Sequence, residues 1–238
     1  MFGIYHRHHY RATHELLQLS RIRRFHHAAK PQIYGNLDYV KNEIRVIKIA
    51  PGRWDDELFC RLKVVSLDRF LSPRYDTLSY TWGSSKTTRT IRVDKQSVDV
   101  SANLFIALRA LRRTFRTVTI WADALCIDQE NNSEKSTQVA LMGRIYKQGR
   151  QTWVSFGCPD ERSVGHEDNL DDQGLENRRI ATSMLTWLAC HDYWSRVWIV
   201  QEIALSHKDP ICIFGRHQVP LLSLDTVFSD WAAGVTRS

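Results

Sequence analysis

Apolar and polar residues alternate with the period of β-strands between residues 43 and 100. Residues 43–50 (EIRVIKIA) alternate apolar and charged residues, which is typical of a strand with one buried face. We expect further strands at 58–65 and 75–82, and a hairpin of two short strands around Asp94-Lys95-Gln96. This pattern predicts an N-terminal β-hairpin region ahead of the rest of the domain.

The spacing then changes to that of helices alternating with short strands. Ser101 is a suitable N-cap for a helix that runs to Arg113, with one apolar face at Leu104, Ala107, Leu108 and Leu111. Strands are expected at 118–122, 151–156 and 211–214, and helices after Asn132 or Ser133, at 175–190 and at 194–205. This alternation predicts an α/β fold, with a mainly parallel central sheet flanked by helices on both faces.

Charge divides the chain unequally. The net charge is +7, and residues 1–30 carry +5 of it through six Lys or Arg and one acid. We therefore expect a basic, His-rich, solvated arm at 1–33, a domain at 34–220 and a C-terminal extension at 221–238. The arm also has the Arg-rich, acid-poor composition of a mitochondrial presequence. The nearly neutral domain argues against nucleic-acid binding.

Composition narrows the class of protein further. Five cysteines without a CxxC spacing favour buried free thiols in a reducing compartment over disulfides or a zinc site. No apolar run is long enough to span a membrane, and the first residues lack the apolar core of a secretory signal. We expect a cytoplasmic protein without a metal or resident cofactor.

Three segments together resemble one protein family. They are YDTLSYTWG (75–83), IWADALCIDQENNSEKSTQVALMGRIY (120–146) and WSRVWIVQE (194–202). In this order and spacing they resemble the HET domain of fungal heterokaryon-incompatibility proteins, over residues 34–220. The resemblance implies self/non-self recognition and programmed cell-death signalling. Its motif positions include Asp128, where the family usually has Asn, and Gln129, Glu134, Gln138 and Gln201.

HET domains are in turn similar to TIR domains, the signalling fold of Toll-type receptors. The segment 195–202 resembles the TIR helix motif that carries the catalytic glutamate of those TIR domains that hydrolyse NAD. The resemblance places that glutamate at Glu202 and implies a TIR-like or flavodoxin-like sheet. The resemblance implies NAD as a substrate rather than a cofactor. No GxGxxG or Walker A loop is present, so a dinucleotide would not be held in the Rossmann or P-loop manner.

The residues around Glu202 allow two roles for this glutamate, one catalytic and one structural. An almost wholly apolar helix would bury Glu202 beside the Trp198 indole, where burial raises the pKa of a carboxyl and suits it to stabilise an oxocarbenium-like state. The alternative is a structural ion pair with Arg196. The same choice applies to Asp123, which follows a strand and either contacts a ligand or caps its own turn.

The end of the first motif offers further contacts for a substrate. Gly83 allows close backbone approach, and Trp82 and Tyr80 can stack on a base or fill the core. Glu134 fits a helix-dipole role better than a catalytic one. We therefore expect a module that self-associates or binds another incompatibility protein, with NAD glycohydrolysis as the alternative and nucleic-acid binding through the arm as the weakest hypothesis.

Overall fold

The computed structural model describes residues 33–68, 74–83, 87–157, 187–188, 190–215 and 217–224. They belong to one unit of the chain, residues 33–238. The described strands form one sheet in the order β5-β4-β2-β1-β6-β3-β7-β8-β9. Their bounds are β1 (Glu43–Ile49), β2 (Phe59–Ser66), β3 (Asp76–Tyr80), β4 (Thr88–Val93), β5 (Gln96–Ser101), β6 (Val118–Trp121), β7 (Thr152–Ser155), β8 (Ile211–Phe214) and β9 (His217–Pro220).

The sheet is mixed, so the prediction of a mainly parallel sheet is correct only in part. Strands β6, β3, β7 and β8 at the centre are parallel to one another, and β2 and β4 form a further short parallel pair. Antiparallel pairs lie on both sides, where β1 pairs with β2 and β6, β4 with β5, and β8 with β9. The long β1–β2 ladder confirms the predicted N-terminal hairpin region and contributes much of the antiparallel pairing.

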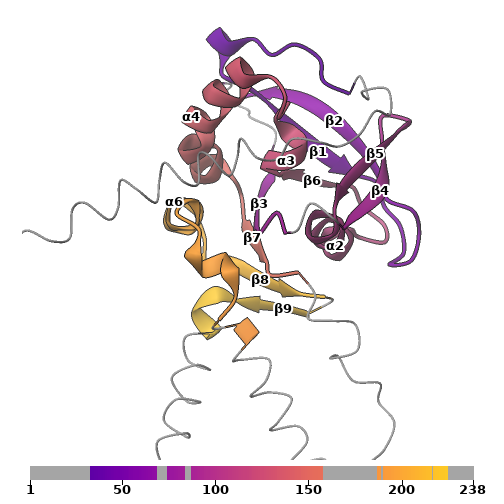
Figure 1. The fold of residues 1–238 in the computed structure, drawn as a ribbon, viewed down its shortest axis with the longest axis vertical. Coiled ribbons are helices and arrows are strands. Elements are labelled where there is room, and N and C mark those ends of the chain that lie inside the picture. The colour runs from indigo at the N-terminus through magenta and orange to yellow at the C-terminus, as the bar shows by residue number, and fades with distance from the viewer. Residues whose placement is uncertain are drawn as a thin grey trace, which may run out of the picture. The chain divides into compact units, whose positions relative to one another are not determined.

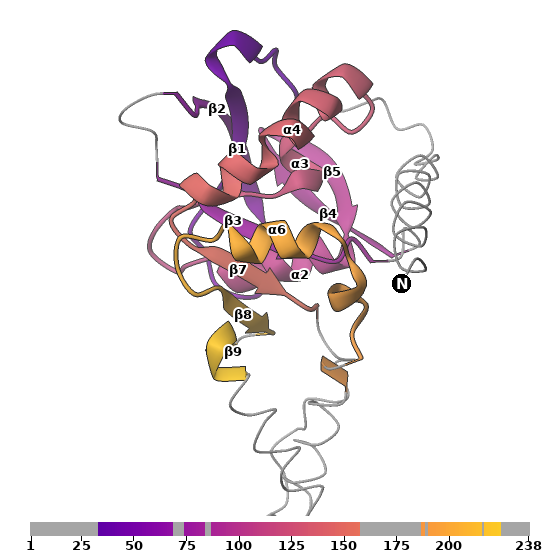
Figure 2. The same ribbon diagram turned by 90° about the vertical axis from the view of Figure 1, so that its left-hand side faces the viewer.

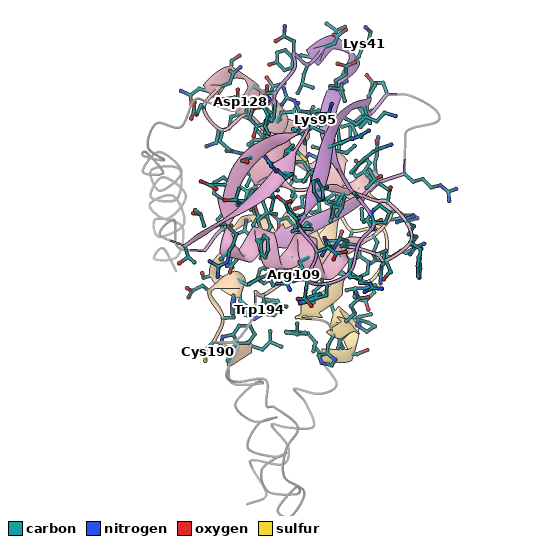
Figure 3. All side chains as sticks on the ribbon, turned by 90° about the vertical axis from the view of Figure 1, so that its right-hand side faces the viewer. Lys41, Lys95, Arg109, Asp128, Cys190 and Trp194 are labelled. Atoms are coloured by element: carbon teal, nitrogen blue, oxygen red, sulfur yellow. The ribbon has the colours of Figure 1, made fainter. Side chains whose placement is uncertain are left out.

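Helices cover both faces of the sheet, as predicted. The helical segments include η1 (Tyr39–Lys41), α2 (Ala102–Leu111), α3 (Asp123–Cys126), α4 (Asn132–Gln148), η2 (Asp192–Ser195) and α6 (Trp198–Ala204). Helices α4 and α6 lie to one side of the sheet and α2 to the other (Figure 1). Views from the two sides agree, because α4 and α6 are in front in Figure 2 and α2, with Arg109, is in front in Figure 3.

Local sequence signals place several elements correctly. The β4–β5 hairpin turns at Asp94 and Lys95, both with positive φ, as a tight hairpin requires. Helix α2 begins after Ser101, whose hydroxyl accepts a hydrogen bond from the Leu104 amide at 3.3 Å. The predicted apolar face of α2 is buried. These features depend on neighbouring residues, which explains why the pattern alone found them.

Other predictions need correction. Strand β1 is buried on both faces rather than one, because Arg45, at a polar position of the alternation, is itself buried. The helix expected at 194–205 is divided into η2 and α6, with Arg196 extended between them. Helix α3 and strand β9 were not expected. Most of the helix expected at 175–190 lies outside the described residues.

The described apolar side chains form two clusters. The larger one packs around β1, β3, β6 and the inner faces of α2 and α4. The smaller one joins β7 and β8 to η2 and α6, through residues that include Val154, Phe156, Tyr193, Ile199 and Cys212. Polar side chains add a second connection, between β3 and the segment that carries η2 and α6.

Candidate functional site

The candidate residues gather beyond the carboxyl ends of β3 and β6. Tyr80 is the last residue of β3, Trp82 and Gly83 follow it, and Asp123 begins α3 just after β6. Strands β3 and β6 are parallel neighbours, so their carboxyl ends lie at the same edge of the sheet. Ligands of open α/β sheets bind at this edge.

Glu202 extends from α6 into this region and is almost fully buried, with 2% of its surface exposed. Its carboxylate accepts a hydrogen bond from the Ser79 hydroxyl on β3. The Tyr193 hydroxyl lies 2.6 Å from the same serine oxygen. Ser79 has one hydroxyl proton, which it gives to Glu202, so Tyr193 is the donor in the second bond. Three buried side chains thus form one hydrogen-bonded chain between η2, β3 and α6.

Arg196 is the cation that faces this chain. Its guanidinium donates to the Tyr80 carbonyl at 2.5 Å and lies 3.7 Å from the Glu202 carboxylate. Burial lowers the pKa of Arg196, but the charges of Glu202 and Asp123 outweigh burial and raise it. One guanidinium therefore serves two carboxylates, and its bond to the Tyr80 carbonyl fixes it at the end of β3.

Both carboxyl groups have raised pKa values. Burial raises the pKa of Glu202 above its ordinary value of 4.5, against the opposite effects of Arg196 and the Ser79 hydrogen bond. Burial likewise raises the pKa of Asp123 above 3.8, although Arg196 and the Trp82 indole lower it. Carboxyl groups shifted in this way are typical of acid–base sites and of buried ion-pair networks alike.

Asp123 connects the two strand ends directly. Its carboxylate accepts from the Trp82 indole N–H at 2.8 Å and from the Ala124 amide at 2.8 Å. Gln129 donates to the Asp123 carbonyl at 2.9 Å. The capping role predicted for Asp123 is thus present, and its bond to Trp82 goes beyond it. Trp82 is half-buried, with its indole nitrogen turned to Asp123.

Gly83 has a positive φ of 71° and is exposed. A Cβ here would lie 2.8 Å from the Asn103 amide nitrogen, and one at Gly157, after β7, would lie 3.1 Å from the Asn103 oxygen. Asn103 donates to the Thr81 carbonyl at 3.0 Å. The first turn of α2 therefore packs closely against the ends of β3 and β7, which explains the need for glycine at both positions.

Several motif positions prove to be structural. Glu134 is not only a helix-dipole residue, because it is buried and pairs with Arg45 of β1 at 2.5 Å. Gln138 donates to the Glu43 carbonyl at 2.9 Å. Asp128 accepts from the Glu130 amide in the turn before α4. These three residues hold α4 and the preceding turn in place and lie outside the Glu202 hydrogen-bond chain.

Two residues of the last motif, Gln201 and Trp198, lie on α6 away from the Glu202 carboxylate. Gln201 lies over Gly143 of α4, where a Cβ would come within 2.5 Å of its amide nitrogen. Glycine at this point allows α6 to approach α4 closely. Trp198, predicted to contact substrate, is the first residue of α6 and is only half-buried. The polar groups next to Glu202 come instead from Ser79, Tyr193 and Arg196.

Sequence reasoning missed Ser79, Tyr193 and Asn103. Ser79 stands inside the first motif, between Leu78 and Tyr80, and alternation alone could have placed it on one face with Thr77 and Thr81. Nothing in the pattern singles out Tyr193 or Asn103, because their partners are distant in sequence.

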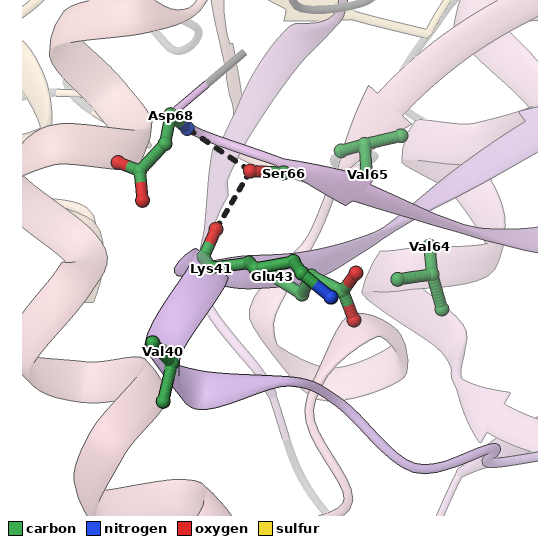
Figure 4. Close-up of a pocket in the computed structure, with 7 residues that line it drawn as sticks. All are labelled: Val40, Lys41, Glu43, Val64, Val65, Ser66 and Asp68. Carbon is green, nitrogen blue, oxygen red and sulfur yellow. Dashed lines mark hydrogen bonds between the residues drawn. The ribbon is translucent and has the colours of Figure 1, made fainter.

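A shallow pocket of about 420 Å³ lies elsewhere, beside η1 and the adjoining ends of β1 and β2 (Figure 4). Its wall is fixed by Ser66, which donates to the Lys41 carbonyl at 2.6 Å and accepts from the Asp68 amide at 3.1 Å. None of the predicted site residues lines it. Among the described residues, no group of His, Cys, Asp or Glu is arranged to hold a metal ion, and no helix is long and apolar enough to cross a membrane.

Comparison with known proteins gives the family. Residues 75–202 match the family of heterokaryon incompatibility proteins (HET). The chain is also 32% identical over 147 residues to Heterokaryon incompatibility protein 6, OR allele, of Neurospora crassa. That match covers 56% of this chain and 21% of the relative, so the chain spans about a fifth of that protein. No solved structure matches. The matched region includes the hydrogen-bonded residues Ser79, Tyr193 and Glu202, the Asp123–Trp82 contact, and Glu134, the partner of Arg45. The protein chain belongs to the HET family.

Proposed function

We propose that this chain is a module of fungal heterokaryon incompatibility that signals cell death by self-association. Family membership and the name of the Neurospora relative support the role in incompatibility. One observation supports self-association, namely the outward side of α6. Val197 and Val200 there are 56% and 70% exposed, and Ala204 follows at the spacing of the same helix side. Exposed apolar side chains grouped on one helix are typical of interaction surfaces.

The test uses the full chain expressed in a fungal cell. Val200→Lys places a charge on the outer side of α6, and Val40→Lys does the same to a valine on η1 that is 89% exposed. We expect the parent chain and Val40→Lys to reduce viability and to associate, and Val200→Lys to do neither. Viability counts and size-exclusion chromatography report both properties. A parent chain without effect on viability contradicts the signalling role, and equal behaviour of the two variants contradicts the role of α6.

We infer a second function, NAD glycohydrolysis, from the position of Glu202. This glutamate would act like the catalytic glutamate of the TIR domains that hydrolyse NAD. The support is a buried carboxyl with a raised pKa, next to Arg196 and a second carboxyl, at the ligand-binding edge of a parallel sheet. Water would replace nicotinamide at the ribose anomeric carbon, giving ADP-ribose, nicotinamide and a proton. Glu202 would stabilise the oxocarbenium-like state. Tyr80, Trp82, Gly83, Asp123, Arg196 and Trp198 are the proposed substrate contacts.

Because Glu202 is buried, the enzymatic proposal requires a movement that exposes it. With 2% of its surface exposed and its carboxylate bonded to Ser79, Glu202 does not face solvent in the single chain. Self-association would have to shift α6 before Glu202 could meet a substrate. We therefore expect the monomer to be inactive and the oligomer to be active.

The enzymatic test measures nicotinamide release from NAD by the purified chain before and after it is forced to oligomerise through a fused dimerisation segment. Glu202→Gln removes the proposed catalytic carboxylate, and Glu57→Gln removes an exposed one that pairs with Arg92 at 3.3 Å. Release by the oligomer that Glu202→Gln abolishes and Glu57→Gln retains supports the proposal. No release by the oligomer, or equal release by both variants, contradicts it.

A further inference from the structure

Strand β2 is paired on both sides at its start but on only one side at its end. It pairs with β1 from Cys60 to Ser66, whereas it meets β4 only at Phe59 and Cys60. Beyond that point β4 turns at Asp94 into the β4–β5 hairpin. The Asp94 carboxylate accepts from the Leu62 amide at 3.0 Å. Among the described strands, none pairs with the rest of β2 on that side, so this part of β2 is an edge.

The register shows which backbone groups this edge presents. The Ala50 amide donates to the Phe59 carbonyl at 2.8 Å, so the odd-numbered residues of β2 are the ones that bond to β1. The even-numbered residues direct their N–H and C=O groups away from β1, as the bond from Leu62 to Asp94 confirms. Val64 is the next even-numbered residue, and no described residue bonds to its N–H or C=O group.

One face of this edge carries positive charge. Arg61 and Lys63 are exposed on the same face of β2, and Lys48 of β1 lies directly opposite Arg61. No carboxylate of a described residue pairs with any of these three cations. Arg92 of β4, by contrast, pairs with Glu57 at 3.3 Å. Like charges opposite each other on a sheet are destabilising, so this face favours contact with acidic groups.

The other face of the same edge is apolar. Val64 is 39% exposed there and lines the shallow pocket beside η1 (Figure 4). Side chains of a strand alternate between two faces. A strand added next to Val64 would therefore place every second side chain toward Arg61 and Lys63, and the others toward Val64. The edge fits an extended segment in which acidic and apolar residues alternate.

We propose that the edge of β2 around Val64 binds an extended acidic segment of a partner protein, which adds to the sheet as a further strand. The Val64 N–H and C=O groups bond to its backbone, and the three cations attract its carboxylates. A second copy of β2 fits less well, because edge-to-edge pairing would bring Arg61 and Lys63 of both copies onto one face. The proposal goes beyond self-association through α6, since it concerns another surface and another partner.

The first test compares two proline variants of the full chain without a partner. Val64→Pro removes an N–H group that faces outward, and Val65→Pro removes one that is directed at Ile44 of β1. We expect Val64→Pro to lower Tm by less than about 2 °C, and Val65→Pro to lower it by more than about 5 °C or to prevent folding. Differential scanning calorimetry measures both. If Val64→Pro is as harmful as Val65→Pro, the Val64 N–H group already has a partner and the proposal is wrong.

The second test measures binding of a synthetic peptide in which glutamate alternates with valine, by fluorescence anisotropy. Lys63→Glu turns an attraction into a repulsion and should weaken binding about 10-fold or more. Val64→Pro keeps every charge but removes one backbone hydrogen bond, and should weaken binding about 5- to 10-fold. The control is Lys208→Glu, which makes the same change of charge at an exposed lysine between α6 and β8 and should keep the parent affinity.

Several results would overturn the proposal. They are no binding of the peptide by the parent chain, or equal affinity of Lys63→Glu and Lys208→Glu. Loss in Lys63→Glu without loss in Val64→Pro would indicate a general surface for polyanions, such as anionic lipid vesicles or DNA. A dimer of the parent chain that Val64→Pro dissociates and Val200→Lys does not would assign the edge to a second copy. Self-association through α6 is tested separately, because Lys63 and Val64 lie on β2.

Discussion

Two Arg–Glu pairs connect helices to this sheet, and they differ in how closely their charged atoms meet and in how far the arginine is buried. Arg45 and Glu134 meet at 2.5 and 3.0 Å through two parallel bonds. Glu134 also accepts from the Asp128 amide, and Arg45 donates to the Cys126 carbonyl at 3.2 Å. The Tyr34 ring lies over the guanidinium, 5.0 Å from it. Protein encloses this closed pair, although Arg45 Nε is buried without a hydrogen-bond partner among the described residues.

Arg196 and Glu202 form the open counterpart. Their charged atoms are 3.7 Å apart, and 21% of the Arg196 side chain is exposed against 2% for Arg45. Glu202 takes its hydrogen bond from Ser79, while Arg196 also attracts Asp123. The difference teaches that burial alone does not mark a site. Arg45 and Glu134 form a bidentate pair between β1 and α4, whereas Arg196 is shared between the carboxyl groups of Glu202 and Asp123.

The largest expected effect is on the closed pair. Glu134→Gln leaves the Arg45 guanidinium buried without a counter-charge, which should lower the free energy of unfolding by about 3–5 kcal/mol. Urea denaturation followed by circular dichroism measures the change. A loss below about 1 kcal/mol would show that water reaches Arg45. The Arg45–Glu134 pair would then be as accessible to solvent as the Arg196–Glu202 pair.

Ser79→Ala should have the next largest effect, because it removes the group that joins Glu202 to Tyr193. Both partners then stay buried with one bond fewer, and we expect a loss of about 1–3 kcal/mol in the free energy of unfolding. Ser97→Ala, at an exposed serine that accepts from Arg92 at 2.8 Å, is the control and should be near neutral. Equal losses in the two variants would remove Ser79 from the connection between α6 and β3.

A smaller effect is expected in the pH dependence of the open pair. The pKa of Glu202 is raised in the folded chain, so its protonated form adds stability below the ordinary value of 4.5, and this contribution is lost as pH rises through the folded pKa. The stability of the parent chain relative to Glu202→Gln should therefore fall as pH rises above about 4.5. Denaturation curves at several pH values test the sign. A difference that grows with pH would mean that Arg196 outweighs burial.

The smallest effect is expected at a surface pair. Arg92 and Glu57 lie 3.3 Å apart with about half of the Glu57 side chain in solvent. Glu57→Gln should change the free energy of unfolding by less than about 0.5 kcal/mol, because exposed pairs gain little in water. Urea denaturation in low and high salt provides the measurement. A loss comparable with that of Ser79→Ala would show that exposure is a poor guide to energy in this chain.

Part of this fold could be predicted because its signals are local. The Ser101 cap, the turn at Asp94 and Lys95 and the apolar face of α2 each depend on residues within a few positions. The boundary of α6 could not be predicted in this way. The run 194–205 is apolar enough for one helix, but Arg196 is extended so that its guanidinium reaches the Tyr80 carbonyl. A tertiary contact overrides the local preference there.

The sequence by itself determined the family motifs, the hairpin region, the alternation of strands and helices, and Glu202 as a buried carboxyl. The tertiary structure decided what each carboxyl does. Glu134 meets Arg45 across 89 positions of the chain and Glu202 meets Ser79 across 123. It also decided that the Tyr75 hydroxyl donates to the Ile145 carbonyl, 70 positions away. The physical reason is that hydrogen bonds act over about 3 Å in space, whereas residue periodicity describes only neighbours along one element.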